Sequence, residues 1–125
     1  MSLHVSVQEK SKGVYTISPE GSIDTNTYTI LKSETEKVLE QSPHLIIFDM
    51  KDVKFISSAG IGVILVAEQS AKAQGGGVLM VRLQPQIKKV FEVVKTVPLD
   101  QIFATIEELD QYLTDIQNST KSTRK

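Results

Sequence analysis

The stretch Ile46–Leu65, IIFDMKDVKFISSAGIGVIL, decides how the rest of the chain is interpreted. It opens on a continuous apolar run, which is typical of a strand buried on both faces. We expect a loop over residues 50–57 after this strand. Ser58–Gly60 then opens a long helix that continues to about Gln74, and Ser58 is expected to be its N-cap because serine is a preferred residue there. The stretch therefore predicts a buried strand, a loop and a helix in succession.

Strand and helix patterns alternate on both sides of this stretch. Alternating apolar residues predict a half-buried strand, and apolar residues spaced three and four apart predict a helix. Glycines 75–77 end the long helix. The order of elements indicates an α/β fold with a small mixed sheet of four to five strands and helices packed mainly on one face. The remaining expected elements are a hairpin over 3–18, a short strand at 22–23, a helix over 25–40 capped by Asp24, a buried strand over 78–81, a helix over 86–94, a short strand over 102–104 and a final helix around 109–116.

The apolar residues of these elements define the expected core. We expect the strand segment Ile46–Phe48 to lie inside the sheet, and the helical stripe Ile61–Val66 to be core. A single domain is expected over residues 1–117, because residues 118–125 carry no apolar side chain and are expected to form a disordered polar tail. The side chains predicted to be buried are Ile46, Phe48, Ile61, Ile64, Leu65, Leu79, Val90 and Phe91.

Composition limits the possible functions. The chain has no cysteine, which excludes disulfides and a cysteine nucleophile. Its formal net charge is −1 with mixed signs, so we expect no direct nucleic-acid partner. We see no signal peptide and no apolar run long enough to span a bilayer, and we expect a cytoplasmic protein without membrane insertion. No residues have metal-ligand spacing, so no metal or other cofactor is expected.

Residues 46–65 resemble the signature of STAS domains, in particular that of the free-standing anti-sigma factor antagonists. The signature is an apolar strand ending in Asp, a short loop, an aromatic and an apolar residue, and a serine segment with glycines that opens a helix. Three further segments resemble family motifs in the right order, so that the likeness extends over about residues 5–115. They are Gly21–Asp24 before the first helix, Gly76–Leu79 before a strand, and the spaced residues Phe103, Ile106 and Leu109 near the end.

The resemblance implies a partner-switching regulator of bacterial transcription. In this family the unphosphorylated antagonist binds an anti-sigma factor that is also a serine kinase, and the binding releases the sigma factor. The kinase then phosphorylates the antagonist at the start of the helix, which ends the binding, and a serine phosphatase removes the phosphate. By position the phosphoacceptor is Ser58. Asp24 corresponds to the family's acidic residue beside the acceptor, implicated in kinase recognition, and Ser57, Ala59 and Gly60 complete the expected partner surface.

The sequence departs from the family pattern at Ser57, where the family carries Asp. Two adjacent hydroxyls result, and Ser57 is an alternative phosphoacceptor. Two other classes of function remain open. One is an interaction module of the same fold without phosphorylation, such as a scaffold or a subunit of a transport assembly. The other is an enzyme with Ser57 or Ser58 as nucleophile, which is disfavoured because neither histidine is near in sequence and the Gly-x-Ser-x-Gly elbow is absent. We expect no catalytic residues.

Elementary physics gives the phosphoserine hypothesis a basis. The start of a helix has unpaired N–H groups and the positive end of the helix dipole, so a phosphate is tolerated there. Because the carboxyl ends of parallel strands meet at one edge of a sheet, we expect Asp24 and Asp49 near this phosphate. A structural role as helix caps is compatible with Ser58 and Asp24.

Overall fold

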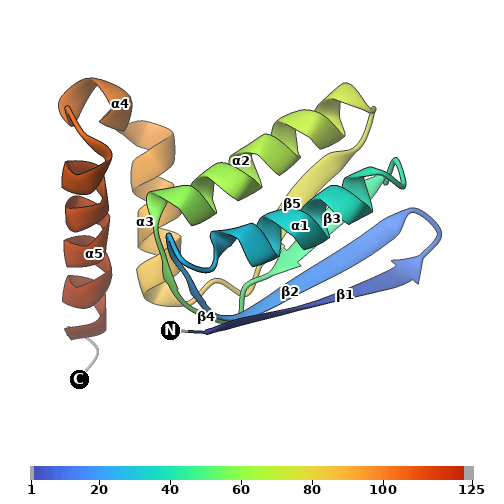
Figure 1. Cartoon of the computed structure of the whole chain (residues 1–125), viewed down its shortest axis with the longest axis horizontal. Helices are drawn as coiled ribbons and strands as arrows, with labels where there is room; N and C mark the ends of the chain where they lie inside the picture. The colour runs from blue at the N-terminus through green and yellow to red at the C-terminus, as the bar shows by residue number, and fades with distance from the viewer. Residues whose placement is uncertain (1, 123–125) are drawn as a thin grey trace.

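The computed structural model describes residues 2–122, which form one five-stranded mixed sheet and a set of helices (Figure 1). The sheet has the order β1-β2-β3-β5, and β4 also pairs with β2. The elements are β1 (Leu3–Ser11), β2 (Val14–Ile23), α1 (Tyr28–Leu39), β3 (Leu45–Asp49), β4 (Asp52–Ile56), α2 (Ser58–Ala73), β5 (Gly77–Val81), α3 (Pro85–Thr96), α4 (Leu99–Ile102) and α5 (Ile106–Ser122).

The long strand β2 organises the sheet. On one side it pairs antiparallel with β1. On the other side its first half pairs in parallel with β3, and its second half pairs in parallel with β4. The loop expected over residues 50–57 is therefore wrong, because the chain turns only at Met50–Lys51 and then forms β4. The second half of β2 supplies backbone hydrogen-bond partners for β4. The β4 side chains Val53 and Ile56 are fully buried.

One face of the sheet carries the core. The register places Ile17 of β2 beside Phe48 of β3, and Phe48 beside Met80 of β5. Ile17 and Phe48 are fully buried on this face. Figure 1 shows α1 and α2 lying side by side across the sheet. Two predictions are confirmed: β3 lies inside the sheet, and the helices pack mainly on one face.

The predicted core is confirmed at most positions and wrong at two. Leu79 is 53% exposed, because β5 is an edge strand and Leu79 pairs with Ile47 on the face opposite Phe48 and Met80. Leu65 is 38% exposed, and its neighbour Val66 is 59% exposed, since they lie on the outer face of α2. The positions confirmed as buried are Ile46, Phe48, Ile61, Ile64, Val90 and Phe91.

The C-terminal helices gather at one end of the sheet, where α5 packs against α3 and also contacts α2 (Figure 1). The short strand expected over 102–104 is wrong: Ile102 ends α4, and the Phe103 ring packs on the Tyr112 ring with centroids 5.1 Å apart. Helix α5 continues to Ser122, so the described residues 118–122 are helical where we expected a disordered tail. Residues 123–125 of that expected tail lie outside the described residues.

Candidate functional site at the start of α2

The N-cap of α2 is Ser57, one residue before the expected position. Ser57 has extended backbone angles, φ −96° and ψ 175°, and its carbonyl accepts the first helical hydrogen bond from the Ile61 N–H at 3.0 Å. Ser58 is therefore the first helical residue. Ser57 is 4% exposed, and its hydroxyl finds no partner within the described residues, whereas Ser58 and Ala59 are partly exposed. The two adjacent serines thus occupy different environments.

The β2–α1 junction and the β4–α2 junction are joined directly. The Ser57 N–H donates to the Ile23 carbonyl at 2.8 Å. A Cβ on Gly60 would lie 2.5 Å from Ile23 Cγ2 and 2.8 Å from Ile56 Cγ1, so only glycine lets α2 start this close to the strand ends. Gly60 therefore allows the backbone of α2 to pack closely against the strand ends of the sheet. Asp24, which follows Ile23, is carried to the same end of the molecule as Ser58.

Asp24 is a capping residue in the turn before α1. Its Oδ1 accepts hydrogen bonds from the Asn26 N–H at 2.9 Å and the Thr27 N–H at 3.1 Å. The Thr27 hydroxyl donates in turn to the Ser22 carbonyl at 2.7 Å. Because this turn occupies residues 25–27, α1 begins at Tyr28 and not at the expected residue 25, with Thr27 as its N-cap. The prediction that Asp24 is the N-cap of α1 is therefore wrong by three residues, and the Asp24 side chain stabilises the turn that precedes the helix.

Two residues of α5 hold the β4–α2 junction, and the sequence analysis did not single them out. Asp110 Oδ1 accepts the Ser58 N–H at 2.8 Å. The Gln117 side chain accepts the Ile56 N–H at 2.9 Å and donates to the Ile56 carbonyl at 2.8 Å. Gln117 follows Leu113 by four residues and so lies on the apolar face of α5, where a polar residue signals a buried hydrogen bond. Nothing in the sequence links Asp110 to Ser58.

Two apolar hollows flank the exposed face of α2. The larger, about 1020 Å³, lies beside Ser58 and is walled by α2, by the 94–99 segment and by the first half of α5. The smaller, about 230 Å³, lies between α1 and α2. Ala59 and Gly62 line both, and a Cβ on Gly62 would meet nothing within 4 Å. The start of α2 is thus a ridge between two hollows, with Ser58 at its head.

Asp49 does not belong to this site. The expectation that it lies near Ser58 is wrong, because β3 ends level with the middle of β2, whereas β4 continues to the end of β2. The ends of β3 and β4 are separated by roughly 16 Å along β2 at about 3.3 Å per residue. Asp49 instead accepts hydrogen bonds from both Arg82 Nε, at 3.1 Å, and Arg82 Nη2.

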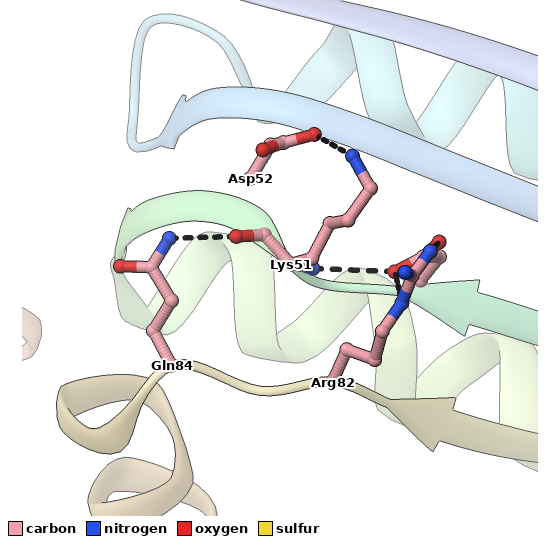
Figure 2. A network of polar contacts seen from close by, with 5 residues as sticks. Lys51, Asp52, Arg82 and Gln84 are labelled. Carbon is pink, nitrogen blue, oxygen red and sulfur yellow. Dashed lines mark hydrogen bonds and ion pairs between the residues drawn. The ribbon is translucent and has the colours of Figure 1, made fainter.

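The Asp49 carboxylate belongs to a separate polar network through its hydrogen bonds from Arg82 and Lys51. Figure 2 labels the other members of this network, which are Lys51, Asp52, Arg82 and Gln84. The hydrogen bonds from Arg82 hold the pKa of Asp49 below its ordinary value against the opposing effect of burial, and the Lys51 N–H adds a further hydrogen bond at 3.3 Å. Lys51 Nζ also pairs with Asp52, and Gln84 Nε2 donates to the Lys51 carbonyl at 2.7 Å. Figure 2 shows these side chains converging on the turn between β3 and β4, so the network fastens that turn.

The two histidines lie apart from this site and from each other. His44 lies at the start of β3 against Gly13, and His4 lies on β1 opposite Glu20. Within residues 2–122 no cluster of three His, Asp or Glu side chains could hold a metal ion. No helix in this part of the chain combines the length and the apolar character needed to cross a membrane.

Residues 6–109 match the family model of the STAS domain, and the chain belongs to this family. Its relatives include the anti-sigma-B factor antagonist of Bacillus subtilis strain 168, 26% identical over 93 residues that cover 74% of this chain and 84% of the relative. An anti-sigma factor antagonist from Mycobacterium paratuberculosis has a similar structure, with a TM-score of 0.66, 25% identity and coverage of 93% and 95% of the two chains.

The anti-sigma factor antagonist SpoIIAA shares the fold in two forms. The unphosphorylated form matches with a TM-score of 0.67 at 19% identity, over 76% of this chain and 84% of SpoIIAA. The phosphorylated form from Bacillus matches with a TM-score of 0.63 over 76% of this chain and 86% of the other.

Proposed function

We propose that this protein is an anti-sigma factor antagonist whose binding to an anti-sigma factor is switched by phosphorylation of Ser58. The observation that carries the proposal is the partly exposed Ser58 at the head of the α2 ridge, between two apolar hollows. Relatives named as anti-sigma factor antagonists and the two forms of SpoIIAA support it. Such a regulator works in the cytoplasm, is not itself an enzyme and needs no cofactor.

The environments of the two serines favour Ser58 as the acceptor. A kinase must bring the serine hydroxyl in line with a phosphoryl group, and this requires an accessible side chain. Ser57 is buried, and its N–H is held by the Ile23 carbonyl. Phosphorylation of Ser57 would require the two loop–helix junctions to separate, and we therefore keep it as the alternative acceptor only.

The proposed partner surface is the ridge formed by Ser58, Ala59 and Gly62, together with the apolar hollows on each side. Apolar surface of this kind provides the free energy of association, and a rim of charged groups adds specificity. Asp24 belongs to the rim by its position at the joined junctions, and we propose that it contacts the kinase. Ser57 and Gly60 support this surface without contacting the partner, because both are buried and hold the start of α2 against the sheet.

Phosphorylation changes the charge of this surface. The partner kinase transfers the γ-phosphoryl group of ATP: a bond forms between Ser58 Oγ and phosphorus, the bond to ADP breaks, and the hydroxyl proton passes to a base of the kinase. The product carries about −1.5 to −2 additional charge at neutral pH. Binding would then require the phosphate to be desolvated against an apolar contact, which opposes association. A serine phosphatase reverses the change.

Intact-mass analysis after co-expression with serine kinases of the host tests this function. We expect the parent chain and Ser57→Ala to gain the mass of one phosphoryl group, and Ser58→Ala to gain none. Phosphate on Ser57 in the Ser58→Ala variant would move the acceptor by one residue. A chain that is never phosphorylated, and whose Ser58→Asp variant binds the anti-sigma factor as well as the parent does, would be a non-switching STAS interaction module.

A further inference from the structure

We propose that Asp110 on α5 positions the phosphoacceptor in the unphosphorylated state, and that a phosphate on Ser58 displaces it and loosens the first half of α5. The inference rests on Ser58 being the acceptor, and it adds a second element to the switch. Phosphorylation would then change the shape of the partner surface as well as its charge.

The hydrogen bonds at the start of α2 show what Asp110 does. The first N–H groups of a helix have no helical partner and need an acceptor from outside. The Ser57 hydroxyl, which stands at the N-cap position, makes no capping hydrogen bond. Asp110 Oδ1 instead accepts the Ser58 N–H at 2.8 Å. Asp110 lies on α5, 52 residues after Ser58 in the chain. A carboxylate is well placed there because the positive end of the α2 dipole attracts it.

A phosphate on Ser58 would compete for the same place. It carries more charge than a carboxylate and three strong acceptor oxygens, and it is attached next to the donors that Asp110 uses. Two anions at one helix start repel each other, and we expect the carboxylate to withdraw, because the phosphate has more charge and more acceptor oxygens for the helix N–H groups.

The first half of α5 is the part that can move. Residues 104–108 are all exposed, and their side-chain contacts are local ones, such as the Ala104 N–H donating to Glu108 Oε1. Further along, Gln117 is 1% exposed and holds the backbone of Ile56 by two hydrogen bonds. We therefore expect the displacement to end before Gln117, since that residue anchors the second half of α5.

The displacement would reach the larger hollow beside Ser58. Ile106 and Leu109 of α5 form part of its wall, opposite Ile61 and Leu65 of α2. Loosening α5 would open this wall and remove apolar surface from the place where a partner docks. Phosphorylation of Ser58 would thus also change the position of α5, which forms part of the same partner surface.

Hydrogen exchange on the free protein tests the inference without any kinase or partner. Phosphoserine is incorporated at position 58 during translation, and exchange is followed by mass spectrometry in peptides covering residues 104–113. We expect the phosphorylated parent to exchange there about tenfold faster than the unphosphorylated parent, as repulsion between neighbouring anions predicts. Peptides around Gln117 should stay unchanged.

Three variants separate positioning from a general structural effect. Asp110→Ala should raise exchange in 104–113 without phosphate. Asp110→Asn keeps an acceptor oxygen but removes the charge, so it should restore protection and also abolish the response to phosphate. Asp115→Asn removes one exposed charge from the same helix and should respond like the parent. Equal exchange of the phosphorylated and unphosphorylated parent would overturn the inference, and so would an undiminished response in Asp110→Asn. Failure to find a kinase would count against the proposed function alone.

Discussion

The chain has two junctions beside β2, and their polar groups are arranged in opposite ways. The first lies between β3 and β4 and is fastened by Asp49, Arg82 and their neighbours (Figure 2). The second lies between β4 and α2 and holds Ser57 and Ser58. In the first, the charged groups are paired with each other. In the second, the Ser57 hydroxyl is buried and has no hydrogen-bond partner within residues 2–122, and Ser58 is partly exposed. The carboxylate that accepts the Ser58 N–H belongs to the distant helix α5.

The comparison shows that a polar residue at a strand end does not by itself mark a functional site. The sequence places Asp49 near the expected phosphate, yet in the structure Asp49 pairs with Arg82 and the pair stabilises a turn. The β4–α2 junction is different because its backbone groups are held by Asp110 and Gln117 of α5, whereas its two serine side chains do not pair with each other. The predictions below test this contrast, beginning with the largest expected effect.

Removing the anchor of the second junction should have the largest effect. Gln117→Ala leaves the Ile56 N–H and carbonyl without their partner and creates a small cavity, so we expect it to lower the free energy of unfolding by about 2–4 kcal/mol. Gln111→Ala removes an exposed glutamine of the same helix that contacts Asp115, and should change stability by less than about 0.5 kcal/mol. Urea denaturation measures both. Equal effects would mean that Gln117 does not hold the junction.

Crowding the start of α2 should have the next largest effect. Gly60→Ala forces a methyl group against Ile23 and Ile56, and we expect a net loss of about 1–2 kcal/mol because the overpacking exceeds the gain in helix propensity. Gly62→Ala, two residues along the same helix, meets nothing and should raise stability by about 0.5–1 kcal/mol. Shifts of the urea denaturation midpoint in opposite directions relative to the parent would confirm the difference. If both variants were stabilised, α2 would not lie as close to the strand ends as described.

Breaking the first junction should have a smaller effect that depends on pH. Arg82→Ala leaves Asp49 without its main partner, and since Arg82 is largely exposed we expect only a small loss of stability at neutral pH. Arg82 holds the pKa of Asp49 below its unfolded value, so this stabilisation is complete above an ordinary aspartate pKa of about 3.9 and is lost as the pH falls further.

The pH dependence provides the control for that variant. The difference in unfolding free energy between the parent and Arg82→Ala should shrink when thermal unfolding is repeated below about pH 4. Lys51→Ala breaks the exposed pair with Asp52 and should leave stability nearly unchanged at every pH. A difference for Arg82→Ala that stays constant down to acid pH would show that the side chain acts by packing and not by charge.

The sequence predicts the layers of this fold because apolar spacing reports burial directly. It predicts Ser57 and Ser58 through the motif over residues 46–65, and Asp24 through the separate segment Gly21–Asp24, because each of these motifs is continuous in the chain. It does not predict β4, since the segment Asp52–Ile56 gains its strand partner only from the far half of β2. The exposure of Leu79 depends on β5 being an edge strand, which strand spacing does not reveal. Asp110 reaches Ser58 only through the packing of α5, and a local pattern cannot report such a contact.

The most direct test of the central claim is the affinity of the anti-sigma factor for two forms of this chain. Isothermal titration compares the unphosphorylated protein with protein carrying phosphoserine at position 58. Phosphoserine at Ser70, a partly exposed serine near the end of α2, is the matched control. We expect phosphorylation of Ser58 to weaken binding at least about tenfold, because the added charge lies within the contact surface. Phosphoserine at position 70 should leave the affinity unchanged. Equal affinities for the unphosphorylated and the Ser58-phosphorylated chain would contradict the account.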